Sequence, residues 1–187
     1  MADKIYITYE DIHKDTELLY TKLKAMSCIP DYIVAIGTGG FVPARIIKTF
    51  FNDIPIICIN ISYYHEEHIL HFHPKEIQTI HINSPEHVMI KHKNILIIDD
   101  LDDTRTTLSY ISEYLLTLEP NSITIGVLHN KRKKKLKQLN DTINYVSAKN
   151  VDDIWIVYPW ESKNITKHNK LRDPFWEIQN ILCEVNI

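Results

Sequence analysis

The chain has 187 residues, 44% of them hydrophobic, and a formal net charge of −3. These values predict one domain with a full hydrophobic core, and the charge gives no indication of nucleic-acid or membrane binding. Apolar runs stay short of the roughly 18 residues that a membrane-spanning helix needs, the N-terminus lacks the apolar core of a signal peptide, and the three cysteines have no metal-binding or redox spacing, so we expect a cytoplasmic protein.

The first expected element is a helix over residues 9–26, because Thr8 and Asp11 have the spacing of a capping box and apolar residues then recur at helical spacing. A β-rich run, YIVAIG (32–37), ends in glycine, and PARIIKTFF (43–51) has helical character. Further strands are predicted at IPIICINIS (54–62), ILII (95–98) and SITIGVLH (122–129), with weaker candidates at INYVSAK (143–149) and IWIVY (154–158). Near-continuous Ile and Val runs separated by helical segments indicate an α/β fold, with a mostly parallel central sheet flanked by helices.

The stretch NILIIDDLDDTRTTLSYI (94–111) combines an apolar run with four aspartates within five residues. Apolar residues then return at helical spacing, at Leu108, Ile111, Leu115 and Leu118. The turn between them therefore lies at the carboxyl end of a strand and the amino end of a helix, where α/β proteins place their ligands.

The residue types of this turn suit a phosphorylated sugar. Helix N-terminal amides, threonine hydroxyls and the Arg105 cation favour a phosphate monoester, and the aspartates suit ribose hydroxyls or a Mg²⁺ held mostly through water. The alternative is an N-capped helix with solvated acids, but capping needs only one or two such residues.

A second polar turn, GTGGF (37–41), follows the first predicted strand. The chain has only 4 glycines, and three of them are Gly37, Gly39 and Gly40. Their backbone N–H groups could bind a pyrophosphate; the alternative is a plain glycine turn between strand and helix. The stretch is not a P-loop, because no Gly-Lys-Ser/Thr follows.

Both turns resemble one family. ILIIDDLDDTRTT is similar to the phosphoribosyl-pyrophosphate (PRPP) signature of type I phosphoribosyltransferases, with Arg105 in place of the signature's glycine. Four motifs resemble those of the fungal hypoxanthine-guanine and xanthine phosphoribosyltransferases: DDTRTTL, AIGTGGFVPARI, VLHNK and YPWE. The resemblance runs in order from about residue 5 to 162. The resemblance implies the type I phosphoribosyltransferase fold in a single domain over residues 1–187, with a mobile active-site loop at 62–92 and a small hood to which about 143–162 contribute.

The resemblance also implies roles in PRPP binding. Asp99 and Asp100 would meet the ribose hydroxyls and the Mg²⁺, with Asp100 as the main metal contact. Asp103 would lie beside the purine N7 and act as the catalytic base. The pyrophosphate would be bound by Thr38, Gly39 and Gly40, and the 5′-phosphate by Thr104, Arg105, Thr106 and Thr107. Two roles for Arg105 stay open, a phosphate contact or support of the loop.

Three further residues are implied for the purine. Lys131 would donate to the 6-oxo group, Trp155 would stack on the base, and the Ile156 carbonyl would face position 2. Pattern alone favours other interpretations: Lys131 begins the basic run KRKKK and would be solvated, and Trp155 would be a core or interface residue. We expect the other basic residues, 132–135, at the surface.

The implied reaction converts a 6-oxopurine (hypoxanthine, guanine or xanthine) and PRPP into the nucleoside 5′-monophosphate and pyrophosphate, in purine salvage. The implied partners are Mg²⁺ and further copies of the chain, as a dimer or higher homo-oligomer, with neither nucleic acid nor membrane. The alternatives are a PRPP-binding regulator without turnover and a phosphoribosyltransferase for another nucleobase.

Seven of the ten histidines lie between residues 65 and 92. His65, His68, His71 and His73 have spacings that could bind zinc, but no cysteine accompanies them, so we expect solvated loop histidines. The tail, 163–187, has no predicted role.

Overall fold

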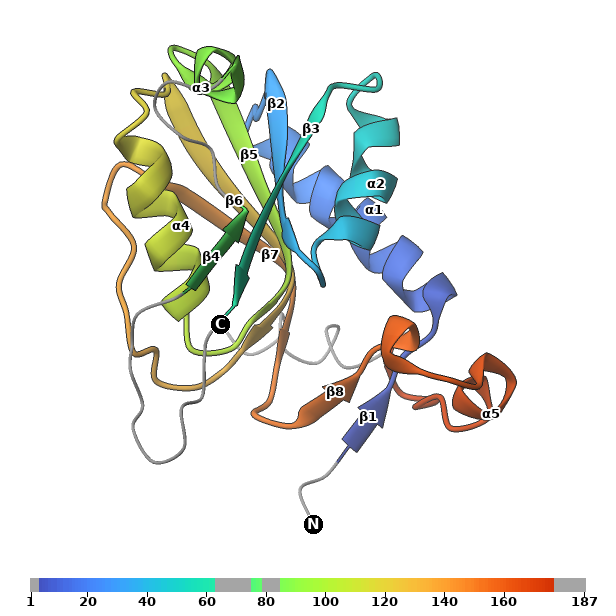
Figure 1. The fold of residues 1–187 in the computed structure, drawn as a ribbon. Coiled ribbons are helices and arrows are strands. Elements are labelled where there is room, and N and C mark those ends of the chain that lie inside the picture. Colours follow the sequence, from blue (N-terminus) through green and yellow to red (C-terminus); the bar gives the residue numbers. More distant parts are fainter. Residues whose placement is uncertain (1–3, 63–74, 79–84, 177–187) are drawn as a thin grey trace.

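A six-stranded sheet forms the centre of the computed structural model (Figure 1), which describes residues 4–62, 75–78 and 85–176. The strand order is β4-β3-β2-β5-β6-β7. Five strands run parallel: β2 (Tyr32–Gly37), β3 (Ile56–Ser62), β5 (Asn94–Asp102), β6 (Ser122–Lys131) and β7 (Asn144–Val151). The sixth, β4 (Lys75–Gln78), pairs antiparallel with β3 at one edge. The predicted α/β fold with a mostly parallel sheet is confirmed.

Helices cover both faces of this sheet. Helices α1 (Tyr9–Ala25) and α2 (Phe41–Phe50) pack on one face and α4 (Thr106–Leu116) on the other (Figure 1). Successive residues of β5 alternate between the two layers: Leu96 and Ile98 belong to the core cluster under α1 and α2, and Ile95 and Ile97 to the cluster under α4. Burial on both faces is why these strands are apolar runs without a polar alternation.

Helix α1 begins at the predicted capping box. The Thr8 hydroxyl accepts from Asp11 N at 3.2 Å, and the Asp11 carboxylate accepts from Thr8 N at 2.8 Å. Two donors at the helix start are thus paired reciprocally. None of the helices in the described ranges is long and apolar enough to cross a membrane.

Strand β5 is longer than expected. The predicted strand ended at Ile98, whereas β5 continues through the first three aspartates and pairs with β6 as far as Asp102 opposite Asn130. The acids therefore extend from a strand end rather than from a loop, because pairing with β6 outweighs their low strand propensity.

A second, two-stranded sheet lies beside the carboxyl ends of the main strands. It pairs β1 (Lys4–Tyr6) in parallel with β8 (Trp155–Val157), and Ile5 lies opposite Ile156. A 3₁₀ turn (Pro159–Glu161) and α5 (Ile165–Asn169) follow. Residues 143–162 are thus divided between the sheets, with β7 in the main one and β8 in the small one.

The expected mobile loop, 62–92, is described only in part, as β4 and α3 (Pro85–Ile90). His65, His68, His71 and His73 lie outside the described residues, and the tail is described as far as Trp176.

Candidate functional site

A cavity of about 590 Å³ opens at the carboxyl ends of β2 and β5, between the main sheet and β8. The predicted site residues that line it are Thr38, Gly39, Asp99, Asp100, Asp103, Thr107, Lys131, Trp155 and Ile156. Four others lie outside its lining: Gly40, Thr104, Arg105 and Thr106. The position is where α/β folds place ligands.

Two adjacent carboxylates occupy the floor of the cavity. Asp99 is buried and its Oδ1 accepts from Asp100 N at 3.0 Å. Burial, followed by the nearby Asp100 charge, raises the pKa of Asp99 well above its usual value, and burial also raises the pKa of Asp100. Two buried acids this close cannot both ionise without a compensating cation.

The pair fits a divalent cation that brings other ligands with it. Within the described residues, no group of three or more His, Cys, Asp or Glu side chains is arranged to hold a metal ion. Mg²⁺ commonly binds through one or two carboxylates, completing its shell with water and substrate phosphates.

The glycine turn lies directly against these acids. The Gly37–Thr38 peptide bond is cis. A Cβ added to Gly39 would collide with the Asp100 carboxyl group, and one added to Gly40 would lie 2.5 Å from the Ile98 carbonyl oxygen and 2.7 Å from that of Ile36. Gly40 has an ordinary φ of −70°, so glycine is required there by close approach rather than by conformation.

Two lysines and two aspartates form a charged cluster, of which Lys131 and Asp103 line the cavity. Lys131 Nζ lies 3.4 Å from both Asp103 Oδ1 and Asp153 Oδ1. Lys133 Nζ lies 2.6 Å from Asp103 Oδ1 and 3.0 Å from Asp153 Oδ1, and hydrogen bonds to these two carboxylates raise the pKa of Lys133. The side chain of Lys133 is 26% exposed, as expected for a surface residue. The prediction that Lys135 lies at the surface is wrong, because its side chain is only 10% exposed.

Aromatic side chains form the wall on the hood side. Trp155 on β8 is 58% exposed, so the interpretation of it as a core residue is wrong for this chain. Tyr158 and Trp160 stack with ring centroids 4.6 Å apart. These two residues and Glu161 line the cavity, but they were not predicted as site residues. Their motif, YPWE, contributed only to the family resemblance.

A buried polar network lies behind that wall. His129 Nε2 lies 3.0 Å from Asp15 Oδ2, and His129 Nδ1 lies 2.8 Å from the Tyr158 hydroxyl. The Tyr158 hydroxyl in turn donates to the Asp100 carbonyl oxygen at 3.3 Å. Because His129, Asp15 and Tyr158 are all buried, this chain of contacts ties α1 to the acid pair through the interior.

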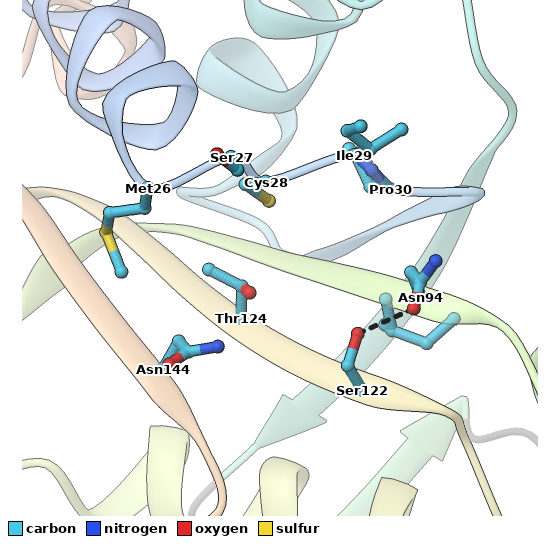
Figure 2. Close-up of a pocket in the computed structure, with 10 residues that line it drawn as sticks. Met26, Ser27, Cys28, Ile29, Pro30, Asn94, Ser122, Thr124 and Asn144 are labelled. Atoms are coloured by element: carbon cyan, nitrogen blue, oxygen red, sulfur yellow. Dashed lines mark hydrogen bonds between the residues drawn. The ribbon is translucent and has the colours of Figure 1, made fainter.

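Another cavity, of about 320 Å³, lies at the amino ends of β5, β6 and β7 (Figure 2). It is lined by residues 26–30, which follow α1, by Ile95, and by polar residues at the starts of strands. One of these polar residues is Asn94, whose Oδ1 accepts a hydrogen bond from Ser122 Oγ at 2.8 Å. The described residues that line it include no charged side chain, so it has neither the acids nor the lysine of the first cavity.

Comparisons with known proteins agree on one family. The model of the phosphoribosyl transferase domain matches residues 8–163. The chain is 38% identical over 192 residues to hypoxanthine-guanine phosphoribosyltransferase of Schizosaccharomyces pombe, covering 89% of this chain and 93% of the relative. It is 34% identical over 199 residues to xanthine phosphoribosyltransferase 1 of Saccharomyces cerevisiae, covering 90% and 95%.

Solved structures are similar over the same length. A hypothetical protein from Neisseria gonorrhoeae with bound ppGpp is 34% identical with a TM-score of 0.84, over 91% of this chain and 96% of that one. A purine phosphoribosyltransferase from Pyrococcus horikoshii is 28% identical with a TM-score of 0.68, over 87% and 97%.

Proposed function

The chain belongs to the phosphoribosyl transferase family, and we propose that it transfers phosphoribose from PRPP to a 6-oxopurine in purine salvage, releasing pyrophosphate. One observation carries the proposal: a single cavity is lined by an acid pair and a glycine turn together with a lysine, an aspartate and an exposed tryptophan. The first set suits a metal-bound phosphosugar and the second a planar base.

On the PRPP side, Asp99 and Asp100 would bind the ribose hydroxyls and Mg²⁺, which supplies neutralising charge to the departing pyrophosphate. Backbone amides of the 38–40 turn would hold the pyrophosphate, and the start of α4, with Thr107 in the cavity lining, would hold the 5′-phosphate. Because Thr38 carries no charge, the negative charge of the pyrophosphate would be neutralised by the backbone amides and the metal ion.

On the purine side, Lys131 favours an oxo group at position 6 because an ammonium group only donates hydrogen bonds. Trp155 offers an exposed ring for stacking. Pairing of β8 with β1 fixes the backbone at Ile156, opposite Ile5, and the Ile156 carbonyl would face position 2. Asp103 would accept the proton that the purine loses as its nitrogen attacks the anomeric carbon.

The relatives support a purine rather than another nucleobase. Two of them are named for hypoxanthine, guanine or xanthine. The structure with bound ppGpp, at 34% identity, adds a guanine nucleotide to the ligands found on this fold.

We also propose that the chain is a single domain and forms a homo-oligomer, a dimer or higher. Sedimentation velocity measures the oligomeric state directly.

The deciding experiment is a steady-state assay with PRPP, Mg²⁺ and each of hypoxanthine, guanine, xanthine, adenine and uracil. We expect turnover with at least one 6-oxopurine, and a kcat/KM for adenine at least about 100-fold lower, because its amino group cannot accept a hydrogen bond from Lys131. Binding of PRPP without turnover of any base would favour the regulator, and turnover of uracil alone would favour another base class.

The two turn glycines should respond differently to alanine. Gly39→Ala pushes against the Asp100 side chain, which can rotate, so we expect an unfolding free energy within about 1 kcal/mol of wild type but at least a tenfold lower affinity for PRPP. Gly40→Ala pushes against backbone carbonyls, which cannot move alone, so we expect a stability loss of about 2 kcal/mol or more. Urea unfolding and PRPP calorimetry on both variants measure the difference; equal stability losses would contradict it.

A further inference from the structure

Arg105 adopts a backbone conformation that its side chain must compensate. It lies directly before α4 with φ 67° and ψ 7°, in the left-handed region. This region favours glycine and is costly for residues with a Cβ, and the signature that this stretch resembles has glycine at the same place. Arginine here therefore requires contacts that offset the backbone cost.

The Arg105 side chain turns toward the neighbouring strand. Its Nε and Nη2 donate to Asp102 Oδ2 at 2.9 and 2.8 Å. Its guanidinium lies over the ring of Tyr145 on β7, with Cζ 4.7 Å from the ring centroid. Because Arg105 is absent from the cavity lining, these contacts hold the cation beside the cavity rather than in it.

The partner of Arg105 is a buried carboxylate. The side chain of Asp102 is 0% exposed. Its Oδ2 also accepts from the Tyr145 hydroxyl at 2.9 Å, and Lys135 Nζ lies 3.4 Å from its Oδ1. A buried carboxylate is stable only with such compensation, and removing the main cation leaves it poorly paired.

The same cluster fixes the backbone of the turn. Lys135 Nζ donates to the carbonyl oxygens of Asp102 at 2.7 Å and Asp103 at 3.1 Å, and Leu136 N donates to that of Thr104 at 3.0 Å. Three successive carbonyls are thus held from the β6–β7 connection. The shape of this turn sets where its amides and hydroxyls meet a ligand.

We propose that Arg105 is a positioning residue, which shapes the phosphate-binding turn 103–107 through the Asp102, Tyr145 and Lys135 cluster and makes no contact with phosphate. The proposal rests on the proposed function in one respect, that this turn binds the 5′-phosphate of PRPP. It predicts that Arg105 and Asp102 depend on one another: an arginine is needed here because Asp102 is charged and buried.

A double-mutant cycle tests this dependence, with Arg105→Gly, Asp102→Asn and both together. Glycine keeps the left-handed backbone at a lower cost and removes the cation together with its packing on Tyr145. We expect Arg105→Gly to weaken PRPP binding about tenfold and to lower Tm by about 5 °C, with the purine KM unchanged. The double variant should recover most of both losses, because the buried carboxylate is gone and Lys135 keeps its two carbonyl acceptors on the turn. Tyr145→Phe, which removes one donor to Asp102, should weaken PRPP binding about two- to threefold.

Two readouts separate this inference from the proposed function. PRPP calorimetry needs no turnover, and thermal unfolding needs no ligand. A double variant that binds PRPP as weakly as Arg105→Gly would show that Arg105 contacts the ligand, and this would overturn the proposal. An Arg105→Gly variant with unchanged PRPP affinity and unchanged Tm would also overturn it. If the wild-type chain binds no PRPP, the proposed function fails, while the Tm values of the cycle still decide whether Arg105 and Asp102 are coupled.

Discussion

Replacing Asp103 by asparagine is expected to lower kcat by about 10²- to 10⁴-fold, the usual contribution of a general base, while the KM for PRPP changes by less than about threefold. Asparagine has the same shape but cannot take up a proton at neutral pH. Asp103 lines the cavity and its side chain is 43% exposed, so a base in the cavity can reach it. Steady-state kinetics with the preferred purine measure both constants.

The neighbouring carboxylate provides a matched control. Asp153 contacts the same two ammonium groups as Asp103, at 3.4 and 3.0 Å, but it is absent from the cavity lining. Asp153→Asn removes one charge from the same cluster and is expected to change kcat by less than about fivefold, as an exposed ion pair does little. Equal losses in the two variants would mean that the cluster's charge balance, rather than proton acceptance by Asp103, limits turnover.

The largest effect on stability is expected from Asp15→Asn, a loss of about 3–5 kcal/mol in unfolding free energy. Asp15 is buried on α1, and Lys149 Nζ lies 2.8 Å from its Oδ1. His129 and the Trp176 indole nitrogen contact its Oδ2, each at 3.0 Å. Asparagine leaves the Lys149 ammonium group buried without its counter-charge. Urea unfolding at pH 7 measures the loss.

The effect of Asp15 should also depend on pH. Burial alone would raise the pKa of Asp15, but hydrogen bonds and charges from His129 and Lys149 outweigh it and lower the pKa below 3.8. A group with a lowered pKa in the folded state stabilises the fold above its unfolded pKa, and this stabilisation is lost as pH falls through the folded pKa. The difference between wild type and Asp15→Asn should therefore be constant above about pH 5 and shrink below about pH 3.8.

Glu10 on the same helix gives the control for Asp15. It pairs with Lys14 at 2.9 Å, but its side chain is 76% exposed. Glu10→Gln makes the same carboxylate-to-amide change in water, so we expect a change below about 0.5 kcal/mol. A loss comparable to that of Asp15→Asn would mean that helix capping and dipole effects, rather than the buried pair, account for the result.

The parallel strands of the main sheet and helix α1 could be predicted from local patterns, because each buried strand is an apolar run and α1 starts at a capping box. The elements β1, β4, α3 and α5 were not predicted, because they are too short for a recognisable periodicity. The position of the acids at a strand end and of the glycines at a turn also followed from the order of elements. Partners in three dimensions could not be predicted. Asp15 and His129 are 114 residues apart, and nothing in the run KRKKK distinguishes the inward-facing lysines from the solvated ones.

The side-chain direction of Arg105 shows the same limit. Its sequence neighbours include threonines and acids that suit either a phosphate contact or support of the loop. The contacts of Arg105 with Asp102 and Tyr145, which favour support of the loop, appear only in three dimensions. Trp176 is a second case: it lies in a tail without a predicted role, yet it is 1% exposed and contacts Asp15. Such roles depend on which distant segments meet, which local sequence does not record.

The pairing of β1 with β8 has a consequence for how the enzyme is made. Residues 4–6 leave the ribosome well before their partners, 155–157. Strands β2 and β5, which precede the residues proposed to bind PRPP, end by Asp102 and can pair earlier. Because domains form as their contacts become available during synthesis, a nascent chain should form the proposed PRPP side of the cavity well before the proposed purine side. Ribosome-bound chains stalled after β6 would then hold half of the proposed site.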